Sequence, residues 1–392
     1  MKKINPAIVA PVLLSFFVVS FIDLVGTGVD ELKQDSDTPQ YVLQLIPFVA
    51  LIWFFLLSVP VGLWQDRSGK KKVLNYGILI TVAGLLVPVL GNSLPVILLA
   101  FTLLGIGNTI LQVSANPLLV DVVPATRASS FLSFSQFIKS LGSMVGPFFA
   151  GMLGPWLARL LGDDSPGAWR YGLYAFALIA ILSWTWLSLV KIEETRPDRP
   201  PATLQSCFKL LGNGYILMMV LGIFVVVGID VAINSNIGTF LSGKLGVGAD
   251  AAKYAKSLYF LAKMIGTFIG ALLLTRLHAG KFLLGSGFLL AIALLVLAFT
   301  PSESSAWVII FIVSLGASNI FPLIFSITVT RFPDRANEIS GLMMMAISGG
   351  AVIPFLVGWF MSFYINGGIL LLLASTLYLI IISLRSLKDQ SP

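Results

Sequence analysis

The chain is poor in the residues that most enzymes and metal proteins use. Among its 392 residues there is one cysteine, Cys207, and one histidine, His278. A single cysteine excludes an internal disulfide, and these two residues cannot build a metal centre or a Cys/His dyad. A membrane enzyme would need acids with His, Cys or a metal near one membrane face. We therefore expect no metal, no cofactor and no enzymatic activity.

Charged residues are also scarce, at 11% of the chain, although the net charge is +7. A basic balance can indicate nucleic-acid binding, but here Lys and Arg occur in alternate loops between apolar runs instead of in one patch. Nucleic acid is therefore not an expected partner.

Apolar runs are what the chain has in abundance, since 57% of its residues are hydrophobic. Twelve runs are long enough to cross a hydrocarbon core of roughly 30 Å. They cover about 7–29, 40–63, 73–91, 95–121, 129–156, 168–191, 213–241, 252–275, 280–300, 305–331, 336–362 and 367–386. None alternates polar and apolar positions as barrel strands do. The predicted fold class is all-α integral membrane, with twelve transmembrane helices in a lipid bilayer.

The distribution of basic residues predicts the orientation of these spans. Placing both termini in the cytoplasm puts most Lys and Arg on that side, as the positive-inside rule requires. The cytoplasmic loops then hold Arg67, Lys70, Lys71, Lys72, Arg127, Lys191, Arg196, Arg199, Lys209, Arg276, Lys281, Arg331 and Arg335, and the opposite loops hold acids such as Asp30, Glu31, Asp35, Asp37, Asp163 and Asp164.

The longest predicted cytoplasmic connection divides the spans six and six. It contains two glutamates and a proline cluster, which is typical of a linker. The predicted domains are an N-terminal six-helix bundle over 1–191, a cytoplasmic linker over 192–212 and a C-terminal six-helix bundle over 213–392.

A weak internal repeat supports this division. Residues 17–23 match 224–230, and residues 142–148 match 349–355, both at the 207-residue offset that separates Asp23 from Asp230. Parallel repeats related by an axis along the membrane normal are typical of a large class of transporters with a substrate site between the halves. The sequence therefore predicts two pseudo-symmetric bundles.

The loop after the second span carries an ordered set of glycines and charges. The set is Gly62, Asp66, Arg67, Gly69, Lys70 and Lys71. It resembles the loop signature between helices 2 and 3 of the major facilitator superfamily, and we interpret it as a conformational latch. The glycines allow close packing and a tight turn, and the charges can pair with helix ends. The alternative is positive-inside charge with no latch function.

Within that superfamily, the chain is similar to the fucose:proton symporter family, which includes bacterial glucose and galactose permeases. The similar segments are 112–117, 135–142 and 321–326. The resemblance implies alternating access, a sugar-sized substrate and the bacterial inner membrane. Gln112 stands where the fucose symporter has glutamate, and Lys139 where it has asparagine, so its proton-coupling residues are not carried over.

Amide side chains form the predicted substrate site. Asn108, Gln112 and Asn116 recur every fourth residue and share one helix face. Amides offer both donors and acceptors, as sugar hydroxyls require. Further candidates are Gln136, Asn234, Asn236, Asn319, Tyr259 and the possible stacking partner Trp53. The alternative is hydrogen bonding between helices, which is common in membrane bundles.

Four ionisable residues lie within the apolar spans: Asp23, Lys139, Asp230 and Lys263. A charge at bilayer depth costs about 2.5–3.5 kcal/mol, so such residues usually face a partner or a transport path. We predict an Asp23–Lys139 pair in the first half and an Asp230–Lys263 pair in the second. The pairs are either proton-coupling switches or permanent salt bridges.

The sequence thus predicts a secondary active transporter that imports a monosaccharide, a hexose, by alternating access with proton coupling. The expected partners are the sugar and H+, and nothing indicates an oligomer, so a monomer is expected. The alternative is an uncoupled facilitator or exporter on the same fold, in which the charge pairs are structural.

Overall fold

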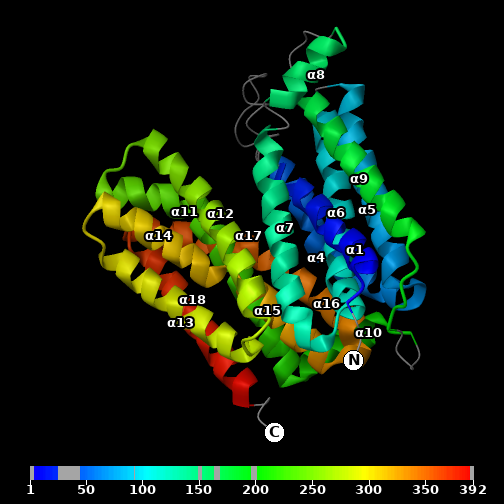
Figure 1. Ribbon diagram of the computed structural model, residues 1–392. Helices are drawn as coiled ribbons and strands as arrows, with labels where there is room; N and C mark the ends of the chain where they lie inside the picture. The colour runs from blue at the N-terminus through cyan, green and yellow to red at the C-terminus, as the bar shows by residue number, and fades with distance from the viewer. Residues whose placement is uncertain are drawn as a thin grey trace. The chain divides into compact units, whose positions relative to one another are not determined.

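The computed structural model describes residues 4–24, 45–91, 93–148, 152–162, 168–195 and 201–388. All regular secondary structure in these ranges is helical (Figure 1). Parts of the predicted spans, including residues 25–29 and 40–44, and residues 196–200 of the predicted linker lie outside them.

The chain separates into two compact units, each assembled from three segments. Unit 1 is Met1–Pro124, Ile138–Cys207 and Asp334–Met345, and unit 2 is Ala125–Phe137, Phe208–Pro333 and Ala346–Pro392. The six-and-six division predicted from the linker remains a prediction, because the units exchange one segment each.

The helices of unit 1 are α1 (Pro6–Val19) with the 3-10 helix η1 (Ser20–Leu24), α4 (Leu45–Ser68), α5 (Lys70–Leu86), α6 (Leu94–Val122), α8 (Gly154–Leu160), α9 (Gly172–Leu189), α10 (Leu204–Lys209, whose last two residues belong to unit 2) and α16 (Ala336–Met345). Those of unit 2 are α11 (Gly214–Leu245), α12 (Ala249–Leu273), α13 (Ala279–Phe299), α14 (Glu303–Ala317), α15 (Ile320–Arg331), α17 (Gly349–Phe363) and α18 (Gly367–Lys388). Helix α7 (Ala128–Phe148) contributes its first part to unit 2 and the rest to unit 1.

The described residues of each of the twelve predicted spans are mainly helical. Within the described residues, ten helical stretches are long and apolar enough to cross a membrane. The other two predicted spans, 73–91 and 129–156, fall on α5, whose α-helical part has 17 residues, and on α7. Several predicted spans are not one continuous α-helix: 7–29 tightens into η1, 73–91 ends in a 3-10 helix at Val87–Leu90, 168–191 begins with one at Ala168–Tyr171, 305–331 is divided into α14 and α15, and 336–362 into α16 and α17.

Local sequence explains where several helices begin and end. Asn5 caps α1 through Ala7 N and is followed by proline, which is favoured in the first turn. Asn213 caps α11 by accepting from Tyr215 N at 2.9 Å. That helix ends at Gly246, whose φ of 66° is the left-handed conformation that glycine adopts without strain.

Close packing in unit 1 depends on small residues. A Cβ on Gly107 of α6 would lie 2.8 Å from the backbone nitrogen of Thr81 on α5, so only glycine allows this approach. Helix α16 packs against both α4 and α6 (Figure 1). The residues that the sequence pattern assigned to the eleventh span therefore begin inside unit 1.

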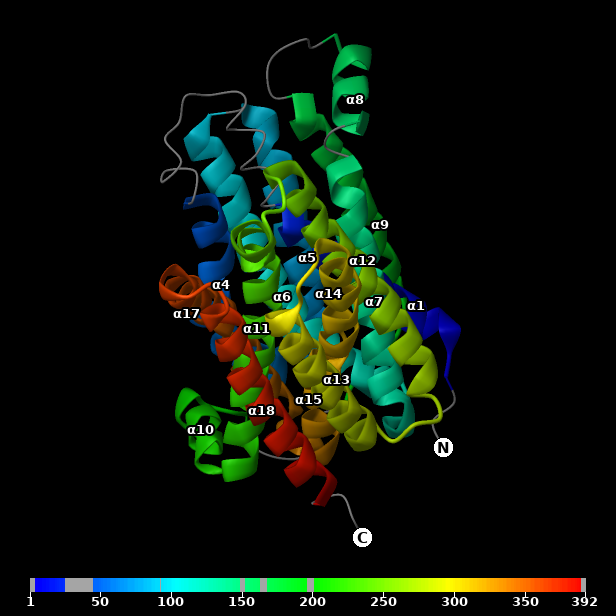
Figure 2. The ribbon, with the colours of Figure 1, turned by 90° about the vertical axis from the view of Figure 1, so that its left-hand side faces the viewer.

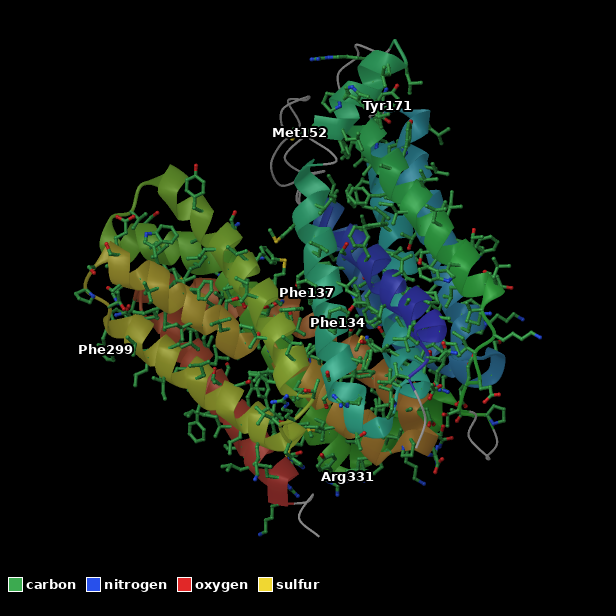
Figure 3. All side chains as sticks on the ribbon, in the orientation of Figure 1. Phe134, Phe137, Met152, Tyr171, Phe299 and Arg331 are labelled. Carbon is green, nitrogen blue, oxygen red and sulfur yellow. The ribbon has the colours of Figure 1, made fainter. Side chains whose placement is uncertain are left out.

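In unit 2, α13 lies between α14 and α18, and α17 packs along α11 (Figure 2). The first part of α7 is bound to this unit through Phe137, whose ring centroid is 5.0 Å from that of Phe268 on α12. Phe134 and Phe137 are neighbours on α7 (Figure 3). Ser130 adds a hydrogen bond of 2.6 Å to the carbonyl of Ala271.

Candidate functional site

The amide face predicted on α6 is a connected hydrogen-bond chain. Asn108 Nδ2 donates to the carbonyl of Val19, the last residue of α1, at 2.5 Å. Gln112 Nε2 donates to Asn108 Oδ1 at 2.8 Å, and Asn116 Nδ2 donates to the Gln112 carbonyl at 2.8 Å. All three side chains are buried. Asn108 therefore ties α6 to α1, which is the interhelical bonding that the sequence left open as an alternative.

Two oxygen acceptors remain on this face. Among the described residues, no donor reaches Asn116 Oδ1, which is fully buried, and no bond to Gln112 Oε1 is formed. A buried acceptor without a donor costs about 1–3 kcal/mol. The face thus has unused hydrogen-bonding capacity at Gln112 and Asn116, and little at Asn108.

Trp53 on α4 lies beside the start of the same face. A Cβ on Gly105, one turn before Asn108, would lie 2.9 Å from Trp53 Cδ1. The indole Nε1 is buried and has no acceptor among the described residues. Gly105 and Asn116 are eleven residues apart, about 16 Å along a helix, so Trp53 adds a free donor at the opposite end of the face from Asn116.

The predicted ion pair between Asp23 and Lys139 is not formed in this structure. Asp23 Oδ2 instead accepts a hydrogen bond of 2.5 Å from Ser143 Oγ, one turn after Lys139 on α7. Gly142 allows this contact, because a larger residue there would collide with Ser20 of η1. Within the described part of the chain, the Lys139 ammonium has no hydrogen bond or ion pair, and Gln136 on the same helix face is also without a hydrogen bond.

Asp230, Lys263 and Tyr259 of unit 2 form a three-membered cluster. Lys263 Nζ lies 2.6 Å from Asp230 Oδ2, and Tyr259 Oη donates to Asp230 Oδ1 at 2.7 Å. The side chains of the ion pair are 24% and 27% exposed, whereas Tyr259 is fully buried. The Tyr259 carbonyl accepts from Ser314 of α14 at 2.6 Å. The cluster thus joins α11 to α12 and is partly exposed at the ion pair.

The asparagines predicted in unit 2 differ in their environments. Asn234, one turn after Asp230, has a buried Oδ1 without a donor among the described residues. Asn236 donates to the Ala232 carbonyl of its own helix at 3.0 Å. Asn319 donates to the Gly266 carbonyl at 2.8 Å and holds the break between α14 and α15 against α12; its Oδ1 also lacks a described donor, but its Nδ2 is used, whereas no hydrogen bond is formed by either end of the Asn234 amide within the described residues. Asn234 is therefore the most available of the three for a ligand.

The predicted latch is a contact between the end of α4, the linker and α16, all within unit 1. Asp66 Oδ1 accepts from Asn337 Nδ2 at 3.0 Å, and Asp66 Oδ2 accepts from Ala202 N at 2.9 Å. A Cβ on Gly62 would lie 2.8 Å from the Asn337 carbonyl and 3.2 Å from Gly341 Cα. The two glycines let α4 and α16 meet backbone to backbone.

Three further residues of the signature, Gly69, Lys70 and Lys71, lie at the start of α5. Gly69 has φ of 90°, a left-handed conformation that suits glycine. Glu194 of the linker accepts from the backbone nitrogens of Lys70 at 2.5 Å and Lys71 at 3.1 Å, so it caps α5 from another segment. Lys70 Nζ is buried and lies 2.5 Å from Asp121 at the end of α6. Arg67, by contrast, is exposed.

Helix α6 contacts α16 at the turn that contains Pro117. Because proline has no N–H, the carbonyl of Val113 loses its intrahelical donor. Ser340 Oγ of α16 supplies the missing donor at 2.7 Å and is fully buried. The sequence indicates the orphaned carbonyl but not its partner.

Glu338 of α16 is a functional candidate that sequence reasoning missed. Its side chain is fully buried, and its carboxylate accepts from Arg335 at 3.1 Å and Ser206 of α10 at 3.1 Å. Cys207 Sγ donates to the Glu338 carbonyl at 3.7 Å. Burial, and secondly the nearby Glu338 charge, raise the pKa of the Cys207 thiol to about 12. An acid inside the predicted span 336–362 was a usable signal.

These features define a class of protein. The chain is a multi-pass α-helical membrane protein, and both units hold amides and ionisable groups inside apolar helices, which is typical of proteins that move polar solutes. The family described as Major Facilitator Superfamily matches residues 12–354, so the chain belongs to the major facilitator superfamily, whose members are transporters rather than enzymes.

Known relatives cover most of the chain. The glucose/galactose transporter of Brucella abortus (strain 2308) is 27% identical over 359 residues, which are 88% of this chain and 85% of that protein. The putative glucose/galactose transporter of Helicobacter pylori (strain ATCC 700392 / 26695) is 26% identical over 371 residues, covering 91% and 89%. A crystal structure of the E. coli fucose:proton symporter FucP has a TM-score of 0.82 at 18% identity, covering 97% of this chain and 99% of that one. This structural likeness confirms the predicted major facilitator fold.

Proposed function

We propose that the protein is a secondary active transporter that moves a monosaccharide, of hexose size, by alternating access. The observation that carries this proposal is the α6 amide face, where the oxygens of Gln112 and Asn116 have no donor among the described residues of an apolar bundle. A sugar hydroxyl would recover the free energy of such an acceptor. The similarity to glucose/galactose transporters favours a hexose.

In this proposal amide side chains supply the substrate contacts. Gln112 and Asn116 serve as hydrogen-bonding groups for the sugar, with Asn108 positioning Gln112; Trp53, at the other end of the face, does not contact a sugar held at Asn116. Gln136 and Asn234 add contacts. Asn236, Asn319 and Tyr259 act through the helices that they hold in place, as their hydrogen bonds to backbone and to Asp230 support.

The direction we propose is import into the bacterial cytoplasm across the inner membrane, with both termini cytoplasmic and protons as the coupling ion. The 1–191 and 213–392 segments act as the moving bundles and 192–212 as their linker. The basic loops support this orientation.

Asp23 is the proposed coupling group because it is exposed and, among the described residues, its carboxylate is held by the neutral hydroxyl of Ser143, while the Lys139 ammonium one turn away on α7 has no described partner. A carboxylate in this position can take up a proton or exchange Ser143 for Lys139 as its partner. Either change alters the local charge balance and can favour one conformation over another. Asp230 and Lys263, already paired, balance the second half.

The test is uptake into proteoliposomes under an imposed proton gradient, with ligands first selected by thermal shift among hexoses, 6-deoxyhexoses, amino sugars and nucleosides. The Gln112→Leu variant removes one proposed hydrogen bond to the sugar. Sugar binding should therefore weaken about tenfold, equivalent to about 1.4 kcal/mol. Asn366→Ala, in the loop before α18, is the control. Hexose binding that is unchanged in Gln112→Leu would contradict the proposed site.

An uncoupled facilitator or exporter is the second candidate, favoured by the fully formed Asp230–Lys263 pair, which needs no moving part. Asp23→Asn distinguishes the two functions. Under the coupled mechanism, sugar-driven alkalinisation is lost in this variant while sugar exchange continues. Wild-type protein that equilibrates sugar without accumulating it would establish the uncoupled one.

A further inference from the structure

A cavity of about 430 Å³ opens on unit 1 between the start of α5, the end of α9 and the first linker residues, and the proposed sugar site does not use it. Its polar lining includes Lys71, Lys72, Asn75 and Ser188, and its aromatic lining includes Tyr76 and Trp184. Basic and aromatic groups thus share one concave surface.

The surroundings place this cavity at a membrane interface. Leu79, which lines it, and Leu182 on α9 are exposed although they lie in the predicted spans 73–91 and 168–191, so we infer that they face lipid. The α5 lysines begin where this apolar surface ends. Tyr76 is also exposed and stacks on Trp64 with 5.5 Å between ring centroids. Tyr and Trp are enriched at this depth, beside lipid headgroups.

The charge of the cavity is suited to an anion. Lys72 is exposed and has no hydrogen bond or ion pair within the described residues. Lys71 Nζ donates to the carbonyls of Ser188 at 3.0 Å and Val190 at 2.6 Å, which fixes its ammonium at the cavity wall. Glu194 also lines the cavity, but its two oxygens accept from the first backbone amides of α5. The two lysines and Glu194 give the lining a formal net charge of +1, and the Glu194 carboxylate is held at the α5 amides.

The geometry points to a binding site for the phosphate headgroup of an anionic phospholipid, with Lys72 and Lys71 beside the phosphate, Asn75 and Ser188 as polar neighbours, and the acyl chains along Leu79. Basic clusters just outside a membrane span attract anionic lipid by about 1 kcal/mol per Lys or Arg. A lipid here would also contact the start of α5, where Glu194 and Lys70 complete the latch. The headgroup thus lies where it can stabilise the closed latch.

The test uses the purified full-length protein in mild detergent, with phosphatidylglycerol or phosphatidylcholine of identical acyl chains added in turn. Thermal unfolding and native mass spectrometry report binding. We expect phosphatidylglycerol to raise Tm more than phosphatidylcholine, and the difference to fall by at least half in Lys72→Gln. Lys72 has no described partner, so this variant should fold normally. Lys281→Gln, an exposed lysine at the start of α13, is the matched control and should keep the full difference.

Equal stabilisation by the two lipids, or an equal loss in both lysine variants, would overturn the proposal. Inorganic phosphate and glycerol 3-phosphate form a separate arm: if millimolar amounts reproduce the effect of the lipid, the site binds a soluble phosphate instead and the lipid assignment is wrong. Hexose binding by Lys72→Gln is measured alongside and should be unchanged, so failure of this inference is distinguishable from failure of the proposed transport function.

Discussion

The hydrogen bond from Ser340 to the Val113 carbonyl should be worth more than an ordinary contact between membrane helices. Ser340 Oγ lies 2.7 Å from this carbonyl, and Pro117 removes the only intrahelical donor that the carbonyl would otherwise have. When the hydroxyl is deleted, the carbonyl cannot return to a regular helical bond. The perturbation to test is Ser340→Ala, alone and together with Pro117→Ala.

The expected magnitudes differ between the two backgrounds. Side-chain hydrogen bonds between membrane helices average about 0.6 kcal/mol, whereas leaving a buried acceptor unsatisfied costs about 1–3 kcal/mol. Ser340→Ala in the natural background should therefore lower the free energy of unfolding by about 1–3 kcal/mol. In Pro117→Ala, residue 117 again donates to Val113, and Ser340→Ala should cost about 0.6 kcal/mol, the average for such bonds.

The assay is a double-mutant cycle on unfolding in mixed detergent micelles, followed by tryptophan fluorescence. Ser383→Ala is the matched control: Ser383 is fully buried, but its hydroxyl donates to Leu379 of its own helix, so the carbonyl keeps its regular amide donor. The control should be additive with Pro117→Ala within about 0.5 kcal/mol. An equal cost of Ser340→Ala in both backgrounds would refute the argument that proline makes this bond necessary.

Three further outcomes follow from the charged and titratable groups. Asp230→Asn and Lys263→Met should each destabilise the protein more than the double variant does, because a single change leaves a charge without its partner. Breaking a fully buried ion pair costs about 3–5 kcal/mol, and the loss here should be smaller because both side chains are partly exposed. Thermal unfolding of the three variants checks this, and equal or additive losses would contradict it. Cys207 has its pKa raised to about 12 from 9.0. The folded state therefore keeps the thiol proton that the unfolded state loses, so this group's contribution to stability is complete below pH 9 and falls between about pH 9 and 12. Cys207→Ser should flatten that decline, and maleimide should react slowly with native protein at pH 8; rapid labelling would show that the thiol is accessible. Asp66→Asn should loosen α4 from the Ala202 amide, so proteolysis of the linker should become faster than in Arg67→Gln, an exposed neighbour.

The sequence alone determined the membrane class, the twelve spans and the chemical nature of the polar groups. These properties are local: a run of apolar residues either is or is not long enough to cross the bilayer, and an ionisable residue within it stands out regardless of its neighbours. The same reasoning identified Asp230 and Lys263, which are paired, and the face shared by Asn108, Gln112 and Asn116, because residues four apart always lie on one side of a helix.

Only the tertiary structure decided which group meets which. Asp23 contacts Ser143 instead of Lys139 because a shift of one turn, about 5.4 Å along α7, changes the partner without changing any local pattern. Ser340 reaches Val113, and Glu194 reaches the start of α5, from segments 227 and 124 residues away in sequence. Such contacts depend on the rotation and axial position of each helix, and these are set by the packing of whole surfaces, including the close approach at Gly62 and Gly341.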